Sequence, residues 1–223
     1  MSWKESVKSE WQKFKEIPNF KKKMEYIWDY YRFFIIGAIF ILLLGYPLSS
    51  SIYHKINFKE IFYCAIFNNP IEDPQYTELI DSFSDYYHLN PETQYITIND
   101  SFSYSGYLVT KADYRSMQKI GSIISSKTLD CIIGNDDIIS QYATDNALYD
   151  LETILPSDIY DTISDALCWY SPVSGGEERP YTIDLSMSTK KDLFYTDSPR
   201  LGIIINSQHT DAAIAFIRYL FGL

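Results

Sequence analysis

Residues 33–53 read FFIIGAIFILLLGYPLSSSIY, and no charged residue lies between Arg32 and Lys55. The hydrocarbon core of a bilayer is spanned by about 20 predominantly apolar residues in one helix. No other stretch of the 223 residues combines this length with this apolarity. Residues 33–53 therefore predict one transmembrane helix, which divides the chain into a short segment, 1–32, and a long domain, 54–223.

A cleaved signal peptide is the alternative interpretation of this stretch. Ser49 and Ser51 are small residues at a spacing that suits cleavage. However, 32 residues precede the apolar stretch, and the stretch is longer than the apolar core of a signal peptide, which is about 7–15 residues. We therefore interpret residues 33–53 as a retained signal-anchor.

Charge is distributed unequally on the two sides of this stretch. Residues 1–32 have a net charge of +3, whereas residues 54–223 have a net charge of −13. Basic residues beside a membrane span remain on the cytoplasmic side. We predict a single-pass protein of the cell membrane with a cytoplasmic N-terminus and an extracellular C-terminal domain. The acidic domain also argues against nucleic acid as a partner, because nucleic-acid binding requires a basic face.

The segment 1–32 has the periodicity of an amphipathic helix. Its first apolar residues are three or four positions apart, with Lys and Glu between them; they are Trp3, Val7, Trp11, Phe14 and Ile17. Pro18 ends this run, and Asn19 is suited to cap a second one. A segment this short cannot enclose a core. Its apolar face is therefore expected to contact the lipid bilayer or a membrane-protein partner; a solvated helix without a role is the third alternative.

The domain 54–223 alternates short β-branched or aromatic runs with amphipathic helical stretches. We predict strands at 61–67, 95–98, 130–134, 182–187 and 201–205, and helices at 76–88, after Thr110, after Asn135, after Pro156 and at 210–221. Strands separated by helices indicate crossover connections. The predicted fold class is α/β, with a single, mostly parallel sheet flanked by helices.

Polar residues follow three of the predicted strands. They are Asn68 and Asn69, then Asn99, Asp100 and Ser101, then Asn135, Asp136 and Asp137. Ligands of open α/β sheets bind beyond the carboxyl ends of the strands, so these residues could bind a polar or cationic small molecule through their oxygen atoms. The alternative is structural, because turns and helix N-caps also favour Asn, Asp and Ser. No loop has calcium-binding DxDxDG spacing, and we predict no metal site.

The sequence contains no recognisable catalytic spacing. The three histidines, His54, His88 and His209, are far apart, and neither a GxSxG elbow, a glycine-rich phosphate loop nor a CxxC pair is present. We therefore expect neither an enzyme nor a bound cofactor.

Three fragments resemble the type 2 extracellular, or periplasmic, solute-binding proteins of ABC transporters. The first is IFYCAIFNN (61–69) followed by YTELIDSFSDYY (76–87). The second is SIISSKTLDCIIGNDDIISQYATDNALYDLETILP (122–156), and the third is RLGIIINSQHTDAAIAFIRYLFGL (200–223). The resemblance implies a reduced, one-lobed and membrane-anchored relative of that family. Such a domain lacks most of the second lobe that closes over the ligand, which disfavours tight capture of a solute.

Together these observations predict a non-enzymatic extracytoplasmic interaction domain. The expected role is that of an accessory subunit of a membrane complex such as an ABC-type transporter. The alternative is a tethered receptor that binds a small polar solute at the carboxyl edge of the sheet.

Overall fold

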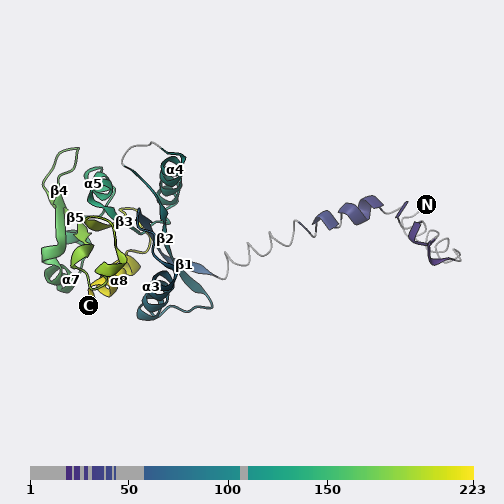
Figure 1. The fold of residues 1–223 in the computed structure, drawn as a ribbon, viewed down its shortest axis with the longest axis horizontal. Helices are drawn as coiled ribbons and strands as arrows, with labels where there is room; N and C mark the ends of the chain where they lie inside the picture. Colours follow the sequence, from purple (N-terminus) through teal and green to yellow (C-terminus); the bar gives the residue numbers. More distant parts are fainter. Residues whose placement is uncertain are drawn as a thin grey trace, which may run out of the picture. The chain divides into compact units, whose positions relative to one another are not determined.

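A computed structural model of the protein describes residues 19–21, 23–25, 28–29, 32–37, 39–41, 43, 58–105 and 110–223. The chain divides into two units, Met1–Asn57 and Phe58–Leu223 (Figure 1).

The described residues of the first unit are helical from residue 20 onward. The helix follows Asn19, whose carbonyl oxygen accepts a hydrogen bond from the amide of Lys23 at 3.0 Å. The predicted amphipathic stripe (Trp3, Val7, Trp11, Phe14 and Ile17) lies outside the described residues, as do residues 38, 42 and 44–53 of the predicted span. Within the part of the chain that is described, no helix is both long and apolar enough to cross a bilayer.

The second unit has α/β architecture. Its strands are β1 (Lys59–Phe67), β2 (Gln94–Phe102), β3 (Cys131–Asn135), β4 (Leu167–Tyr170), β5 (Arg179–Asp184) and β6 (Pro199–Ile203). Its helices are α3 (Asp73–Tyr86), α4 (Lys111–Ser125), α5 (Asp136–Thr144), α6 (Leu151–Ile154), α7 (Ser157–Thr162) and α8 (Thr210–Phe221). Three 3-10 turns complete it: Ser164–Ala166, Leu185–Met187 and Lys191–Leu193.

All six strands form one sheet in the order β2-β1-β3-β6-β5-β4. The β1–β2 and β1–β3 pairs are parallel, whereas β3–β6, β5–β6 and β4–β5 are antiparallel. The prediction of a mostly parallel sheet is therefore wrong, and the sheet is mixed. A parallel connection needs a crossover of a dozen or more residues, usually a helix. Only a loop joins β4 to β5, and only two 3-10 turns lie between β5 and β6, so the chain turns back at the same edge each time.

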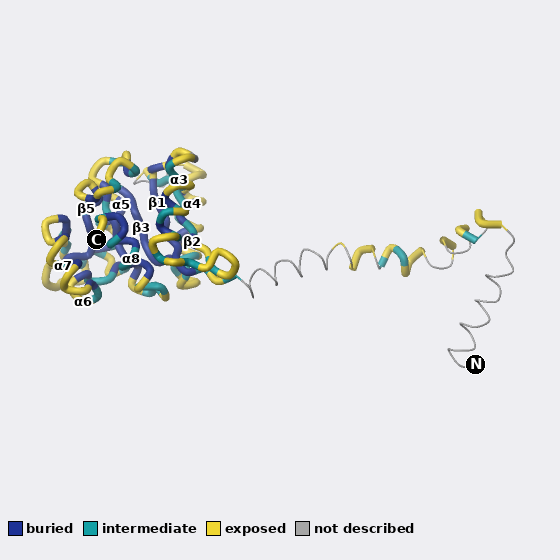
Figure 2. The backbone as a smooth tube through the Cα atoms, turned by 90° about the horizontal axis from the view of Figure 1, so that it is seen from below, coloured by how far each residue is buried: buried dark blue, intermediate teal, exposed yellow. Residues whose placement is uncertain are grey.

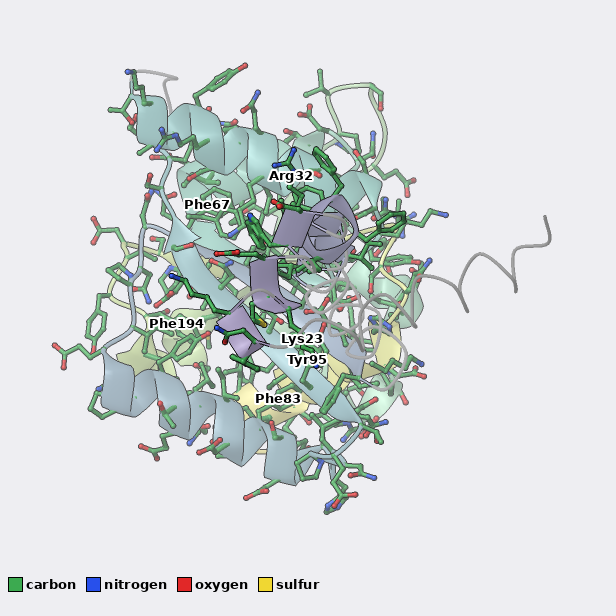
Figure 3. All side chains as sticks on the ribbon, turned by 90° about the vertical axis from the view of Figure 1, so that its right-hand side faces the viewer. Lys23, Arg32, Phe67, Phe83, Tyr95 and Phe194 are labelled. Atoms are coloured by element: carbon green, nitrogen blue, oxygen red, sulfur yellow. The ribbon has the colours of Figure 1, made fainter. Side chains whose placement is uncertain are left out.

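Helices cover both faces of the sheet, and each face has its own hydrophobic cluster (Figure 1). On one face, α3, α6, α7 and α8 pack around Phe62 and Phe83, which projects from α3 toward the sheet (Figure 3). On the other face, α4 and α5 pack against Phe67 and Ile132. The strands between the helices are mostly buried (Figure 2), which explains their continuous apolar runs.

Local sequence signals set several element boundaries as predicted. Thr110 caps α4 through a capping box with Asp113, α7 begins directly after Pro156, and α8 has the predicted bounds. The strands agree less well with the prediction. β4 was not predicted, and β6 begins and ends two residues before the predicted 201–205. β2 continues through Phe102 instead of ending at Ile98, and the predicted strand 182–187 ends at Asp184 and continues as a 3-10 turn.

Candidate functional site

The carboxyl ends of β1, β2 and β3 lie at one edge of the sheet, because these three strands are parallel. Asn68 and Asn69 follow β1 at this edge, and Asn135 is the last residue of β3. Asp136 and Asp137 form the first turn of α5. The structure thus brings together the predicted residues after β1 and β3. The remaining three, Asn99, Asp100 and Ser101, lie inside β2 rather than beyond it.

The asparagines after β1 use their side chains to hold neighbouring segments. Asn68 donates from Nδ2 to the carbonyl of Tyr104 at 2.6 Å and accepts from the Tyr104 amide at 2.9 Å. Asn69 is almost fully buried, donates to the carbonyl of Leu193 at 2.8 Å and accepts from the amide of Tyr195. Both amide groups thus fix chain segments that follow β2 and β5.

The polar residues of β2 are also engaged within the domain. The Asp100 carboxylate accepts a hydrogen bond from the amide of Ile71 at 2.8 Å. Asn99 donates to the hydroxyl of Tyr63 at 3.1 Å and accepts from the hydroxyl of Ser101 at 2.6 Å. These contacts favour the structural alternative for β2. Asn135 precedes α5 as its N-cap residue, but its side chain makes no capping hydrogen bond.

An arginine at this edge was not predicted. Arg200, at the start of β6, forms ion pairs with Asp136 of α5, at 3.5 Å from Nε to Oδ1, and with Asp184 at the end of β5. Tyr170 donates its hydroxyl proton to Asp136. Burial, together with this hydrogen bond, raises the pKa of Tyr170 to about 12. The result is a half-buried polar cluster that joins α5 to three strands.

Two adjoining hollows lie on the α3 side of the same edge. One of about 310 Å³ is lined by residues of α3, α8 and the segment 189–193, and the other, of about 520 Å³, by residues of α3 and the segment 186–199. Gln75 and Asp192 line both. Volumes of about 300–1,000 Å³ are typical of small-ligand sites. Side chains of both charges, among them Glu78 and Lys190, line the first hollow, which suits a polar ligand.

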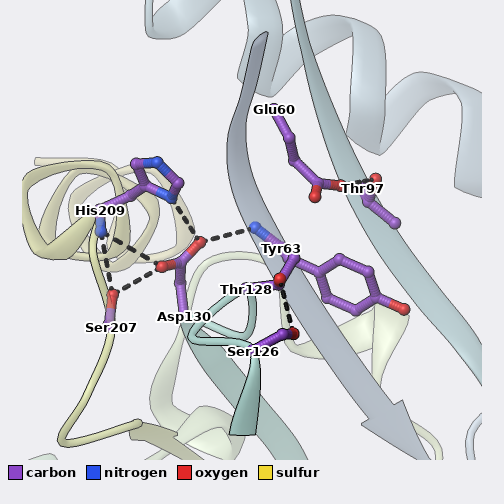
Figure 4. A network of polar contacts seen from close by, with 8 residues as sticks. All are labelled: Glu60, Tyr63, Thr97, Ser126, Thr128, Asp130, Ser207 and His209. Atoms are coloured by element: carbon purple, nitrogen blue, oxygen red, sulfur yellow. Dashed lines mark hydrogen bonds and ion pairs between the residues drawn. The ribbon is translucent and has the colours of Figure 1, made fainter. Parts of the chain in front are cut away.

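The opposite edge of the sheet contains a buried carboxylate (Figure 4). Asp130 has no exposed surface and precedes β3. Its Oδ2 accepts from the amide of Tyr63 at 2.9 Å and lies 3.3 Å from Nδ1 of His209. Its Oδ1 accepts from the hydroxyl of Ser207 at 2.6 Å and from the amide of His209 at 3.3 Å. One side chain thus joins β1, β3 and the turn that begins α8.

This Asp–His–Ser grouping differs from that of a serine hydrolase. In the hydrolase relay, the serine donates to the histidine, and the histidine donates to the aspartate. Here Ser207 donates to Asp130 instead. The geometry therefore anchors the turn before α8 and directs the Ser207 hydroxyl to the carboxylate instead of to the imidazole of His209. Sequence spacing gave no signal for the grouping, because 79 residues separate Asp130 from His209.

Glu60 is a second acidic group near this network (Figure 4). Burial raises the pKa of Glu60 above the ordinary value of 4.5, and the negative charge of Asp130 raises it further. A hydrogen bond from Thr97 and the nearby His209 act in the opposite direction and lower this pKa. The folded state therefore binds this proton more tightly than the unfolded state does. At a pH above this raised pKa, ionised Glu60 lowers the free energy of unfolding. This loss of stability decreases as the pH falls and is absent below about pH 4.5.

We therefore expect Glu60→Gln to raise the melting temperature of the Phe58–Leu223 unit at pH 7, with a gain that vanishes below about pH 4. The glutamine oxygen can still accept the hydrogen bond from Thr97. Thermal unfolding followed by circular dichroism across this pH range checks the expectation. Glu92→Gln, at an exposed position, is the control. Equal pH profiles for the wild type and Glu60→Gln would contradict it.

Comparison of the chain with models of known protein families gave no match, and no curated protein matched it. Among the described residues, no three His, Cys, Asp or Glu side chains are grouped as a metal site would require.

Proposed function

We propose that the chain is a single-pass membrane protein whose α/β domain is a non-enzymatic, extracytoplasmic interaction module. Its role would be that of an accessory subunit of a membrane complex such as an ABC-type transporter. The observation that carries the proposal is the helix formed by the described residues from 32 to 43. Lysines before this helix and the acidic domain after it support a cytoplasmic N-terminus.

This helix exposes apolar side chains on more than one face. Seven of them are between 50% and 77% exposed: Phe33, Phe34, Ile36, Ile39, Phe40, Ile41 and Leu43. Successive helical residues are about 100° apart, so these positions cover more than half of the helix surface. A helix that is apolar all round is stable in a protein core or in a bilayer. Its neighbours in sequence extend the uncharged run to residue 53, which supports the bilayer.

The carboxyl edge of the sheet supports an interaction role over catalysis. The side chains of Asn68, Asn69 and Asp100 each form hydrogen bonds with neighbouring segments of the domain. Arg200 is likewise engaged by Asp136 and Asp184. Such contacts make a rigid surface and leave these groups little freedom to act on a substrate.

Lysines within the apolar helix should release the chain from membranes. We expect Phe40→Lys/Leu43→Lys to move the chain into the soluble or aggregated fraction, because each lysine near the centre of a span costs about 2.5–3.5 kcal/mol. The measurement is the share of chain retained by membranes washed at alkaline pH. Phe40→Leu/Leu43→Ile is the matched control and should remain in the membrane. Equal retention of the lysine variant and the control would contradict the anchor.

The interaction role is tested by purifying the full chain from its own host in a mild detergent. We expect a multi-span membrane protein to co-elute in stoichiometric amount. A monodisperse chain that elutes alone would contradict the accessory-subunit proposal, while leaving the anchor to be judged by the lysine variant.

A tethered receptor for a small polar solute is the second candidate, and the two adjoining hollows favour it. Thermal unfolding of the full chain against single amino acids and sugars tests this candidate. A ligand-dependent rise in melting temperature that is lost in Gln75→Ala, but kept in the exposed control Asp81→Ala, would support it. If none of these solutes raises the melting temperature, the receptor candidate fails for these two classes.

A further inference from the structure

An exposed apolar stripe lies ahead of the apolar helix. Phe20, Met24 and Trp28 are 77%, 51% and 54% exposed, and the described residues around them are helical. Residues four apart in a helix are displaced by only about 40°. The three side chains therefore share one face of the helix. Each of them is more than half exposed.

Basic residues flank this stripe. At about 100° per residue, Lys21 and Lys23 lie on opposite sides of the stripe, whereas Asp29 lies almost opposite its centre. Lys22 and Arg32 add to the local positive charge, and the guanidinium of Arg32 lies 5.0 Å from the ring centroid of Phe33. Glu25 lies about as far from the stripe's centre as Lys23 does. Lysines beside an apolar face are typical of helices that lie at a membrane surface.

We propose that the helix carrying Phe20, Met24 and Trp28 lies along the cytoplasmic surface of the bilayer and binds anionic lipid headgroups. Phe20, Met24 and Trp28 would enter the boundary between headgroups and acyl chains, and Lys21 would contact lipid phosphates. This inference rests on the proposed membrane anchor, since Trp28 lies only five residues before Phe33. Lipid is favoured over a protein partner by charge, because the cytoplasmic leaflet is anionic and residues 1–32 have a net charge of +3.

A tryptophan at position 20 distinguishes a helix lying on the surface from one that projects into water. Phe20 is 13 residues before Phe33. A straight helix continuing from the span would place it about 20 Å from the span's end. The test uses the full chain with Phe20→Trp and its four native tryptophans, Trp3, Trp11, Trp28 and Trp169, changed to Phe. A second chain, which retains Trp28 alone, is the reference.

Both chains are reconstituted into vesicles of phosphatidylcholine that contain brominated lipid, with or without phosphatidylglycerol. We expect phosphatidylglycerol to increase bromine quenching of the position-20 tryptophan by about two-fold and to protect it from acrylamide in water. Lys21→Glu/Lys23→Glu should abolish this increase. Lys111→Glu/Lys127→Glu changes the charge equally at exposed positions of the other unit and should leave it intact.

Three results would overturn the inference. A position-20 tryptophan that is quenched by acrylamide but not by bromolipid, in vesicles that retain the chain, shows that the helix projects into water. Shielding from both quenchers indicates contact with a second copy of the chain instead of lipid. Equal bromine quenching with and without phosphatidylglycerol removes the role of anionic headgroups. Failure of the chain to float with the vesicles would instead contradict the proposed anchor itself.

Discussion

Replacing Asp130 with alanine is expected to destabilise the Phe58–Leu223 unit by about 3–5 kcal/mol, among the largest effects of any single substitution in the domain. The carboxylate is fully buried and accepts from Tyr63, Ser207 and His209. Alanine would leave the buried amide of Tyr63 without a partner and would remove the acceptor of the partly buried Ser207 hydroxyl and His209 amide. Each buried unsatisfied donor costs about 1–3 kcal/mol. The turn before α8 would then lose its attachment to β1.

Thermal and urea unfolding of the Phe58–Leu223 unit measure this effect, because both hydrophobic clusters lie within it. At about 2–4 °C per kcal/mol for a domain of this size, the melting temperature should fall by roughly 6–20 °C. Asp130→Asn keeps the shape and one acceptor oxygen, so its loss should be smaller. Asp81→Ala, at an exposed position of α3, should change stability by less than about 0.5 kcal/mol. Similar losses for Asp130→Ala and Asp81→Ala would contradict the anchoring role.

The sequence was sufficient to predict the elements with strong local signals. The apolar run of β1, the capping residue Thr110 and the amphipathic pattern of α8 all depend on neighbours in the chain, and each was predicted. β4 was missed because its four residues, LCWY, are too few for a periodic pattern. The end of β2 was missed because Asn99, Asp100 and Ser101 are typical turn residues. In the fold, the side chains of these residues form hydrogen bonds with neighbouring groups, which allows the strand to continue through them.

The sheet's direction and the polar clusters depend on contacts between distant residues. Nothing local indicates that β6 runs against β3, so the mixed sheet could not be predicted from element order alone. The same limit applies to the sites. Arg200 meets Asp184 only because β5 and β6 are antiparallel neighbours, and Asp130 meets His209 across 79 residues. The predicted edge residues after β1 and β3 were brought together because those two strands are parallel.

Phe83→Ala is expected to have a comparably large effect, a destabilisation of about 3–5 kcal/mol. Phe83 is fully buried at the centre of an aromatic cluster. Its ring centroid lies 4.9 Å from that of Phe216 and 5.5 Å from those of Phe62 and Tyr219. The side chain thus joins α3 to both β1 and α8. Alanine would remove these ring contacts and leave a cavity that three separate elements would have to collapse together to fill.

The size of the loss is measured by urea unfolding of Phe83→Ala, Phe83→Leu and the double variant with Phe216→Ala. Leucine refills most of the volume and should cost less than about 1.5 kcal/mol. The double variant should lose less than the sum of the two alanine variants, because both remove the same ring contact. Tyr114→Ala, an exposed aromatic on α4, controls for ring loss alone. Strict additivity would contradict coupling of α3 and α8 through Phe83. Since α3 and α8 also line the smaller hollow, a loosened cluster should weaken any solute binding there before the domain unfolds.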